Sequence, residues 1–348
     1  MADQEVDAAY ITFPISIAYL TGFHANPHER LMALAVHQES ATLIVPVIER
    51  DRAVQVAGEF GVVSWRDGED AYTFVRDALA GMQTVAVEKD HLTLRAAEAL
   101  QAMTGAAAFT DVSAEVRALR RTKNAVELEK LRSAAEITDA AYEAIVGRIH
   151  IGQSELEVAS MIADSIHSLG GSLAFEPSVQ FGKNSAEPHH PPAGRVLRDG
   201  DLVLLDFGAA FDHYHADITR VLVAGEPSDE QREAHSLVLA AHDAAIAATR
   251  AGVTAGQVDA AARDVIEKAG RGPEFYSRTG HGLGLEIHED PSLDPASPVL
   301  LEAGMVATIE PGVYVTGWGG IRIEDDIVVE HNGARLLTHS DPSLRTIR

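Results

Sequence analysis

The stretch Gly200-Asp-Leu-Val-Leu-Leu-Asp-Phe-Gly208, followed by Asp217, has a counterpart later in the chain. The counterpart is Gly304-Met-Val-Ala-Thr-Ile-Glu-Pro-Gly312, followed by Glu324. In each copy an acid stands between two glycines at matched spacing, and a second acid closes the pattern. Four acids at matched places in two similar segments predict one site that is built by an internal repeat. A cluster of acids needs cations, so the pattern indicates a metal site.

The repeat extends to the segments that precede the two copies. Gly152-Gln-Ser-Glu-Leu-Glu-Val matches Gly252-Val-Thr-Ala-Gly-Gln-Val. Each contains a serine or threonine three residues before a Glu or Gln, which is the spacing of a capping box at the start of a helix. Gly170 and Gly270 stand where these helices would end. We therefore expect a duplicated α+β domain, in which each half has a capped helix followed by an acid-bearing hairpin.

The first acid pair, Asp206 and Asp217, is expected on opposite strands of a hairpin. A hairpin centred between Phe211 and Asp212 would set the two acids directly opposite each other, with their Cβ atoms about 5 Å apart. Two carboxylates this close repel each other unless a cation lies between them or one is protonated. The pair therefore predicts a bound cation.

Glu310 and Glu324 form the second expected pair. A hairpin centred on Gly317 pairs them directly, and the neighbouring glycines permit a turn there. The residues before each pair are apolar, as in Leu202–Leu205. Acids embedded in apolar strands are costly without compensation, which favours metal ligands over a solvated strand edge.

A glycine-rich segment between the hairpins, read as a strand, contains His281 and His288. One imidazole and four carboxylates form a hard, oxygen-rich ligand set that suits Mn²⁺, with Co²⁺, Fe²⁺ or Zn²⁺ as alternatives. Four carboxylates exceed the need of one ion, so we expect two ions that share bridging carboxylates. Such pairs activate a water and polarise a carbonyl or phosphoryl group.

Composition narrows the function further. The 28 basic and 52 acidic residues give a formal charge of -24, which argues against nucleic-acid binding. The absence of cysteine excludes disulfides, thiolate metal sites and a cysteine nucleophile. The acidic N-terminal residues 1–7 do not have the form of a signal peptide, and no apolar run reaches the roughly 20 residues of a membrane span. We expect a cytoplasmic protein without a membrane partner.

The first part of the chain predicts a separate domain. Ala41–Ile48 and Thr84–Glu88 are typical of strands, and residues 96–103 are typical of a helix. This alternation favours a small α/β domain. A long helix is predicted from Ala125 to about Arg148, because its apolar residues follow helical spacing. We place the domain boundary near residue 115, which gives domains of 1–115 and 116–348.

These motifs together resemble the pita-bread (M24-type) metallopeptidases, a family that includes methionine aminopeptidase, aminopeptidase P and prolidase. The five residues that match the family's metal ligands are Asp206, Asp217, His281, Glu310 and Glu324. Ala18–Phe23 resembles the signature of the family's N-terminal, creatinase-like domain, and Leu119–Lys123 resembles its linker. Ile321–Asp326 is similar to the segment around the last ligand. The resemblance implies a pita-bread catalytic domain with a pseudo-twofold repeat.

The resemblance also implies how the ligands are shared. Asp217 and Glu324 would bridge both metals, Asp206 would complete one site, and His281 with Glu310 would complete the other. A metal-bridging hydroxide would attack the scissile carbonyl, with Glu310 as general base.

The same resemblance implies functions for three further residues. His288 would stabilise the tetrahedral intermediate, and His189 matches a histidine used in substrate contact or proton transfer. Arg322, two residues before Glu324, would lie on the same strand face and contact a ligand carboxylate.

The additional N-terminal domain favours the Xaa-Pro branch of the family, whose members are commonly homodimers. We therefore expect hydrolysis of Xaa-Pro dipeptides or short peptides, with aminopeptidase P-like cleavage of longer peptides as the alternative. Creatinase-like amidinohydrolysis and a non-catalytic peptide-binding module are less favoured, because such relatives lose metal ligands that this chain retains.

Two of the positions that depart from the Xaa-Pro pattern are ones that would contact the substrate. Ser277 stands where these enzymes have a histidine that lines the proline-side pocket. Ser292 stands where some prolidases have an arginine that holds the dipeptide carboxylate. Arg278 or Arg195 are candidates to supply the missing cation.

Overall fold

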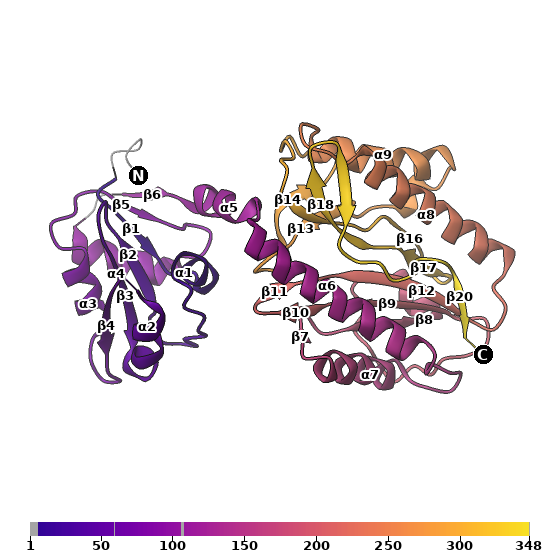
Figure 1. The fold of residues 1–348 in the computed structure, drawn as a ribbon, viewed down its shortest axis with the longest axis horizontal. Helices are drawn as coiled ribbons and strands as arrows, with labels where there is room; N and C mark the ends of the chain where they lie inside the picture. Colours follow the sequence, from indigo (N-terminus) through magenta and orange to yellow (C-terminus); the bar gives the residue numbers. More distant parts are fainter. Residues whose placement is uncertain (1–5, 59, 106–107, 348) are drawn as a thin grey trace. The chain divides into compact units, whose positions relative to one another are not determined.

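The computed structural model describes residues 6–58, 60–105 and 108–347 (Figure 1). The chain forms two compact units, Met1–Arg120 and Arg121–Arg348, and the division falls within helix α5 (Ser113–Arg121). Residues 1–5, on which most of the signal-peptide expectation depends, lie outside the described part. None of the helices in that part combines the length and hydropathy that a membrane span requires.

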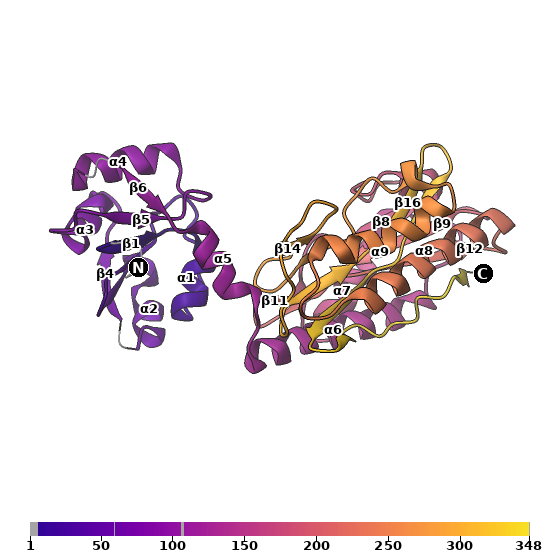
Figure 2. The ribbon, with the colours of Figure 1, turned by 90° about the horizontal axis from the view of Figure 1, so that it is seen from above.

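The first unit is a six-stranded mixed sheet with helices on both faces (Figure 2). The strand order is β4-β3-β2-β1-β5-β6, in which β1 pairs antiparallel with β2 and parallel with β5. Its elements are β1 (Ala8–Ile11), α1 (Pro14–Thr21), β2 (Ala33–Val36), β3 (Ala41–Pro46), α2 (Arg50–Val56), β4 (Gly61–Trp65), α3 (Ala71–Ala78), β5 (Val85–Val87), α4 (Leu94–Thr104) and β6 (Phe109–Asp111).

Alternation along β1 explains why both faces of this sheet are covered. Ala9 and Ile11 belong to a core with residues of α1 and α2, whereas Ala8 and Tyr10 belong to a core with residues of α3 and α4. Successive side chains of a strand point to opposite faces, so an apolar strand without polar alternation must be buried on both. The predicted α/β character of this part of the chain is confirmed.

The second unit repeats one arrangement, in which two helices precede a sheet. Its first half contains α6 (Ala125–Val146), α7 (Glu155–Ser168), β7 (Ser172–Leu173), β8 (Ser178–Phe181), β9 (Leu202–Phe207), β10 (Ala209–Phe211), β11 (Tyr214–His215) and β12 (Ile218–Ala224). Its second half contains α8 (Asp229–Ala248), α9 (Ala255–Lys268), β13 (Gly280–Gly282), β14 (Glu289–Leu293), β15 (Val306–Ile309), β16 (Gly312–Val315), β17 (Gly319–Arg322), β18 (Asp325–Glu330), β19 (Gly333–Leu336) and β20 (Arg345–Ile347).

The predicted helix starts of the repeat are confirmed. Ser154 and Thr254 each accept a hydrogen bond from the backbone of the residue three positions on, and each forms a complete capping box. Gly170 and Gly270 follow the two helices with φ of 87° and 79°, a conformation that glycine adopts without steric cost. The α+β fold with an internal repeat is therefore confirmed.

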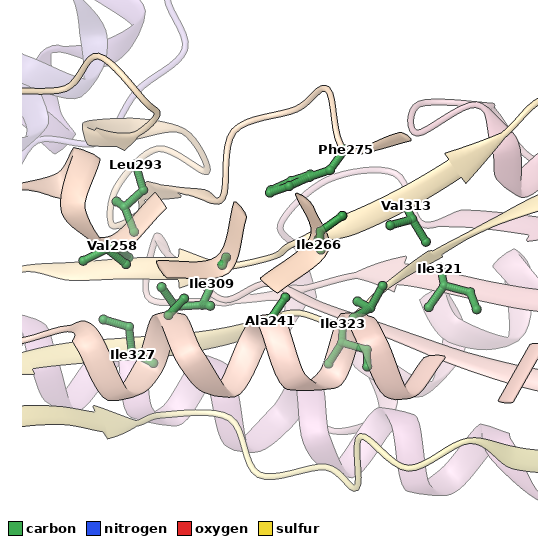
Figure 3. Close-up of a cluster of buried hydrophobic side chains, with 14 of the residues drawn as sticks. Ala241, Val258, Ile266, Phe275, Leu293, Ile309, Val313, Ile321, Ile323 and Ile327 are labelled. Carbon is green, nitrogen blue, oxygen red and sulfur yellow. The ribbon is translucent and has the colours of Figure 1, made fainter. Parts of the chain in front are cut away.

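Two main sheets meet at the centre of this unit. Their strand orders are β20-β12-β9-β8 and β14-β13-β15-β18-β19. On β9, Val203, Leu205 and Phe207 belong to the core that contains α6 and α7 residues, while Leu202 and Leu204 belong to the core that contains α8 and α9 residues. Figure 3 shows part of the second core, including Ala241 of α8 and Ile309 of β15. By strand alternation, Asp206 shares a face of β9 with Leu202 and Leu204, on the side of the core that contains α8 and α9 residues.

Candidate active site

The first acid-bearing hairpin has a register different from the predicted one. Asp206 lies opposite Thr219 rather than Asp217. The reason is the turn, which is centred between Asp212 and His213, one residue later than expected. Both residues have positive φ, 45° and 70°, as in the mirror-image turns that join two-residue hairpins. Asp206 and Asp217 nevertheless line the same cavity.

The second acid-bearing hairpin has the predicted register. Gly312 pairs with Arg322, and Ile309 pairs with Asp325, so one register continues across the position of Glu310 and Glu324. Glu324 also forms an isolated antiparallel bridge with Thr219 of the first half. This bridge joins the two hairpins at the junction between the halves.

The structure brings together the residues that sequence analysis proposed as ligands. Asp217, His281 and Glu324 each offer one ligand atom, and these atoms all lie within 4.8 Å of one another. His281 Nε2 is 3.3 Å from Glu310 Oε1 and 3.8 Å from Asp217 Oδ2. Asp206 lines the same cavity, so all five side chains converge.

His281 is oriented for coordination by its own hydrogen bond. Its Nδ1 lies 3.1 Å from the backbone oxygen of Gly282, an acceptor only, so Nδ1 carries the proton. The lone pair of Nε2 then faces the carboxylates. Burial, followed by the neighbouring His288, lowers the pKa of His281 to about 3, so the ring is neutral, as a metal ligand must be.

The two histidines do not share one strand, contrary to the sequence interpretation. His281 lies in β13, whereas His288 lies at the end of the loop that precedes β14. The loop turns back, so the two rings meet edge to face with centroids 4.3 Å apart. His288, His189 and His190 all line the cavity.

Arg322 contacts both acid pairs. Its guanidinium donates to Thr219 Oγ1 at 2.9 Å, to the Tyr314 hydroxyl at 2.9 Å and to the Asp206 carboxylate. Its Nε is 3.8 Å from Glu324 Oε2. These contacts orient a carboxylate from each hairpin.

The electrostatics of the acid cluster fit a divalent cation. Burial raises the pKa of Asp217 well above its usual range, and Glu324 and Asp206 raise it further. Burial also raises the pKa of Glu310 to about 7 and that of Glu324 well above its usual range. Asp217 Oδ1 is buried and has no hydrogen-bond partner among the described residues. Oxygen-rich donors with an unpartnered buried carboxylate oxygen match the preferences of hard divalent metals.

Three polar residues that support the ligands were missed by the sequence analysis. Thr219 Oγ1 donates to Glu324 Oε2 at 2.6 Å, and Asp326 Oδ2 accepts from the Asp217 backbone N–H at 2.9 Å. The buried guanidinium of Arg220 donates to the backbone oxygens of Thr219 and Glu324. For Thr219 and Asp326 the sequence held one indication of this role. Each stands two residues after a predicted ligand acid, and residues two apart in a strand lie on the same face.

Replacing Thr219 by valine is expected to lower metal affinity and peptidase activity by about 10- to 100-fold. Valine keeps the shape of threonine but removes the hydroxyl that orients Glu324. Thr219→Ser keeps the hydroxyl and should restore most of both quantities. Manganese titration by calorimetry, together with kcat/KM, measures the effect. Equal losses in the valine and serine variants would contradict the proposed role of the hydroxyl.

A cavity of about 620 Å³ opens onto the acid cluster. This volume lies within the range of small-ligand pockets. Its lining residues are Phe175, Glu176, Ser178, Pro188, His189, His190, Pro191, Pro192, Asp206, Asp217, Ser277, Arg278, His281, Ile287, His288, Glu310, Tyr314, Arg322 and Glu324. Arg195 is not among them, and its guanidinium pairs with Asp201 at 2.8 Å. Of the two candidate cations, only Arg278 lines the cavity.

Family comparisons agree with this site. The model of metallopeptidase family M24 matches residues 129–331, and the model of the creatinase/prolidase N-terminal domain matches residues 1–122. The chain belongs to metallopeptidase family M24. The M24 match covers all five acid and imidazole side chains of the cluster, and the chain is accordingly a metallopeptidase with a creatinase-like N-terminal domain.

Three similar proteins match this chain over nearly its full length. The structure of an Xaa-Pro dipeptidase from Bacillus anthracis has a TM-score of 0.94 and 34% identity, covering 99% of this chain and 96% of that one. An X-Pro aminopeptidase from Thermotoga maritima has a TM-score of 0.89 and 32% identity, covering 98% of each chain. An uncharacterized peptidase from Staphylococcus haemolyticus is 38% identical over 97% of this chain and 96% of its own.

Proposed function

We propose that this metallopeptidase uses two divalent ions to hydrolyse the Xaa-Pro bond of dipeptides or short peptides. The observation that carries the proposal is the convergence of Asp217, His281 and Glu324 within 4.8 Å, with Asp206 and Glu310 in the same cavity. Four carboxylates exceed the need of one ion, which supports two. The names of the dipeptidase and aminopeptidase relatives support the Xaa-Pro specificity.

In this proposal, Asp217 and Glu324 would contribute to holding both ions, Asp206 would help to hold one of them, and His281 with Glu310 would help to hold the other. The bound ions would supply an activated water and polarise the scissile carbonyl. Arg322 keeps the carboxylate of Asp206 in place through its hydrogen bond.

Glu310 would act as the general base. Its pKa of about 7, raised mainly by burial, allows its carboxylate to take and release a proton near neutral pH. His288 lies against His281 at the cavity wall, where its neutral ring could donate a hydrogen bond to the developing oxyanion. His189 is exposed at the same cavity, in a place suited to contact the substrate.

Three further features belong to the proposal. Mn²⁺ is the proposed metal because the ligands are mostly carboxylates, with Co²⁺, Fe²⁺ or Zn²⁺ as alternatives. A homodimer and a cytoplasmic location are proposed by analogy with the Xaa-Pro branch.

The function is tested with alanyl-proline, alanyl-prolyl-alanine and alanyl-alanine, each with Mn²⁺ and after chelation. We expect metal-dependent cleavage of the proline peptides at rates at least about tenfold above alanyl-alanine. Faster cleavage of the tripeptide than of the dipeptide would favour the aminopeptidase P-like alternative. A protein that binds two ions but cleaves none of the three peptides would contradict the Xaa-Pro proposal. Failure to bind any ion would favour the non-catalytic alternative.

A further inference from the structure

Two arginines line the active-site cavity, and their surroundings differ. Arg322 is buried, and its guanidinium donates to Asp206, Thr219 and Tyr314. Arg278 is half-buried, and the contact that the structure gives its guanidinium is a 3.4 Å hydrogen bond to Ser292 Oγ. A guanidinium has five N–H donors. Within the described residues, Arg278 therefore has capacity to bind a ligand, whereas Arg322 is already committed.

The strand register places this guanidinium close to the acid cluster. Ser292 in β14 lies opposite His281 in β13. Cross-strand partners share a face and have Cβ atoms about 5 Å apart. The hydrogen bond from Arg278 to Ser292 thus holds the guanidinium on the side of the sheet where His281 faces Glu310. The charge of Arg278 also acts on both Glu310 and His288.

A second donor lies beside Arg278. Ser277 lines the cavity, and its Oγ is a buried atom with no hydrogen-bond partner among the described residues. Buried polar groups normally find a partner, so this hydroxyl is suited to a ligand atom. An arginine with unused donors next to an unpartnered hydroxyl can donate hydrogen bonds to a carboxylate, which accepts charge-assisted hydrogen bonds from arginine.

The rest of the cavity is acidic around the reacting centre. Asp206, Asp217, Glu310 and Glu324 line it there, and among the described residues Arg278 and Arg322 are the only arginines or lysines that line it. The anionic end of a substrate is therefore directed to Arg278.

We propose that Arg278 and Ser277 bind the C-terminal carboxylate of the residue that follows the scissile bond, so that this enzyme selects dipeptides over longer peptides. The inference rests on the peptidase function proposed above and refines its substrate class. In a tripeptide the same position carries a neutral amide followed by more chain, which cannot make the charge-assisted bond.

The test compares alanyl-proline with its C-terminal amide in the wild type, Arg278→Met, Arg278→Lys and Arg271→Met. Wild-type kcat/KM should favour the free acid by about 10- to 100-fold, mainly through KM. Arg278→Met should lower cleavage of the acid to about the level of the amide, with a clearly smaller loss for the amide, while Arg278→Lys should keep part of the preference. Arg271, which pairs with Glu274 outside the cavity, is the matched control.

Two outcomes would overturn this inference. One is equal cleavage of acid and amide by the wild type. The other is an equal loss for acid and amide in Arg278→Met, which would mean that Arg278 acts only on the charges of Glu310 and His288.

Calorimetric binding of both ligands to the metal-free protein separates this inference from the function proposal. If no peptide is cleaved, the peptidase proposal fails. A preference for binding the acid that disappears in Arg278→Met would still support the carboxylate site, and equal binding of acid and amide would reject it.

Discussion

Replacing Asp217 by asparagine is expected to abolish peptidase activity and metal binding together. Asp217 lies at the centre of the cluster, within reach of both His281 and Glu324, and it is the proposed bridge between two ions. An amide offers one neutral oxygen where a bridge needs two charged ones. Because bound metal contributes several kcal/mol to transition-state stabilisation, we expect kcat/KM to fall at least about a thousandfold. Elemental analysis of the purified variant measures its metal content.

Asp212→Asn is the matched control for this experiment. It makes the same chemical change in the same hairpin, but at an exposed turn residue that pairs with Lys130. The activity and metal content of Asp212→Asn should match those of the wild type. Thermal unfolding of metal-free Asp217→Asn should show no loss of stability, because one of several mutually repelling carboxylates is removed. Full activity in Asp217→Asn would refute the proposed metal centre.

The metal-free protein is expected to lose stability as pH rises, through Glu310. Burial raises the pKa of this carboxyl from 4.5 to about 7 in the folded state. Between these values the unfolded chain releases a proton that the folded chain retains, so the free energy of unfolding decreases as pH rises from 4.5 to 7. At about 1.4 kcal/mol per pH unit, Glu310 alone accounts for about 3 kcal/mol. Above pH 7 its contribution is constant.

Urea denaturation of metal-free wild type and Glu310→Gln isolates this effect. Glutamine does not titrate. The free energy of unfolding of the variant, relative to that of the wild type, should therefore rise by about 3 kcal/mol between pH 4.5 and 7. Saturating Mn²⁺ should reverse the wild-type trend, because ligands must lose protons to bind metal. A pH-independent difference between the two metal-free proteins would show that Glu310 titrates as an ordinary surface carboxyl.

The sequence predicted the second acid pair better than the first, and the turns explain the difference. Gly317 is a glycine with φ of 85° at the centre of its hairpin, so the sequence marked the turn. At the first hairpin the positive φ values fall on Asp212 and His213, residues that adopt such values more often than most side chains but mark a turn far less clearly than glycine does. No local signal distinguished this turn from one placed a residue earlier.

The polar residues that support the ligands were harder to predict from the sequence than the ligands themselves. Thr219 and Arg220 belong to a strand whose other residues are apolar, and their partners lie about a hundred residues away, in β18 or just before it. Only the docking of the two halves shows which polar residues meet. Arg278 illustrates the same limit. Whether its guanidinium can reach a substrate in the cavity depends on the face of β14 that carries Ser292, its hydrogen-bond partner.

The bridge between Thr219 and Glu324 has a consequence for protein synthesis. The two residues are 105 positions apart, and the acid cluster is complete only when both hairpins are present. Nascent chains fold from the N-terminus while translation proceeds. A chain that has reached Asp217 but not Glu324 therefore lacks at least one of the four acids and cannot complete the acid cluster. Hydrolytic activity is withheld from the growing polypeptide until the ribosome has added the second half.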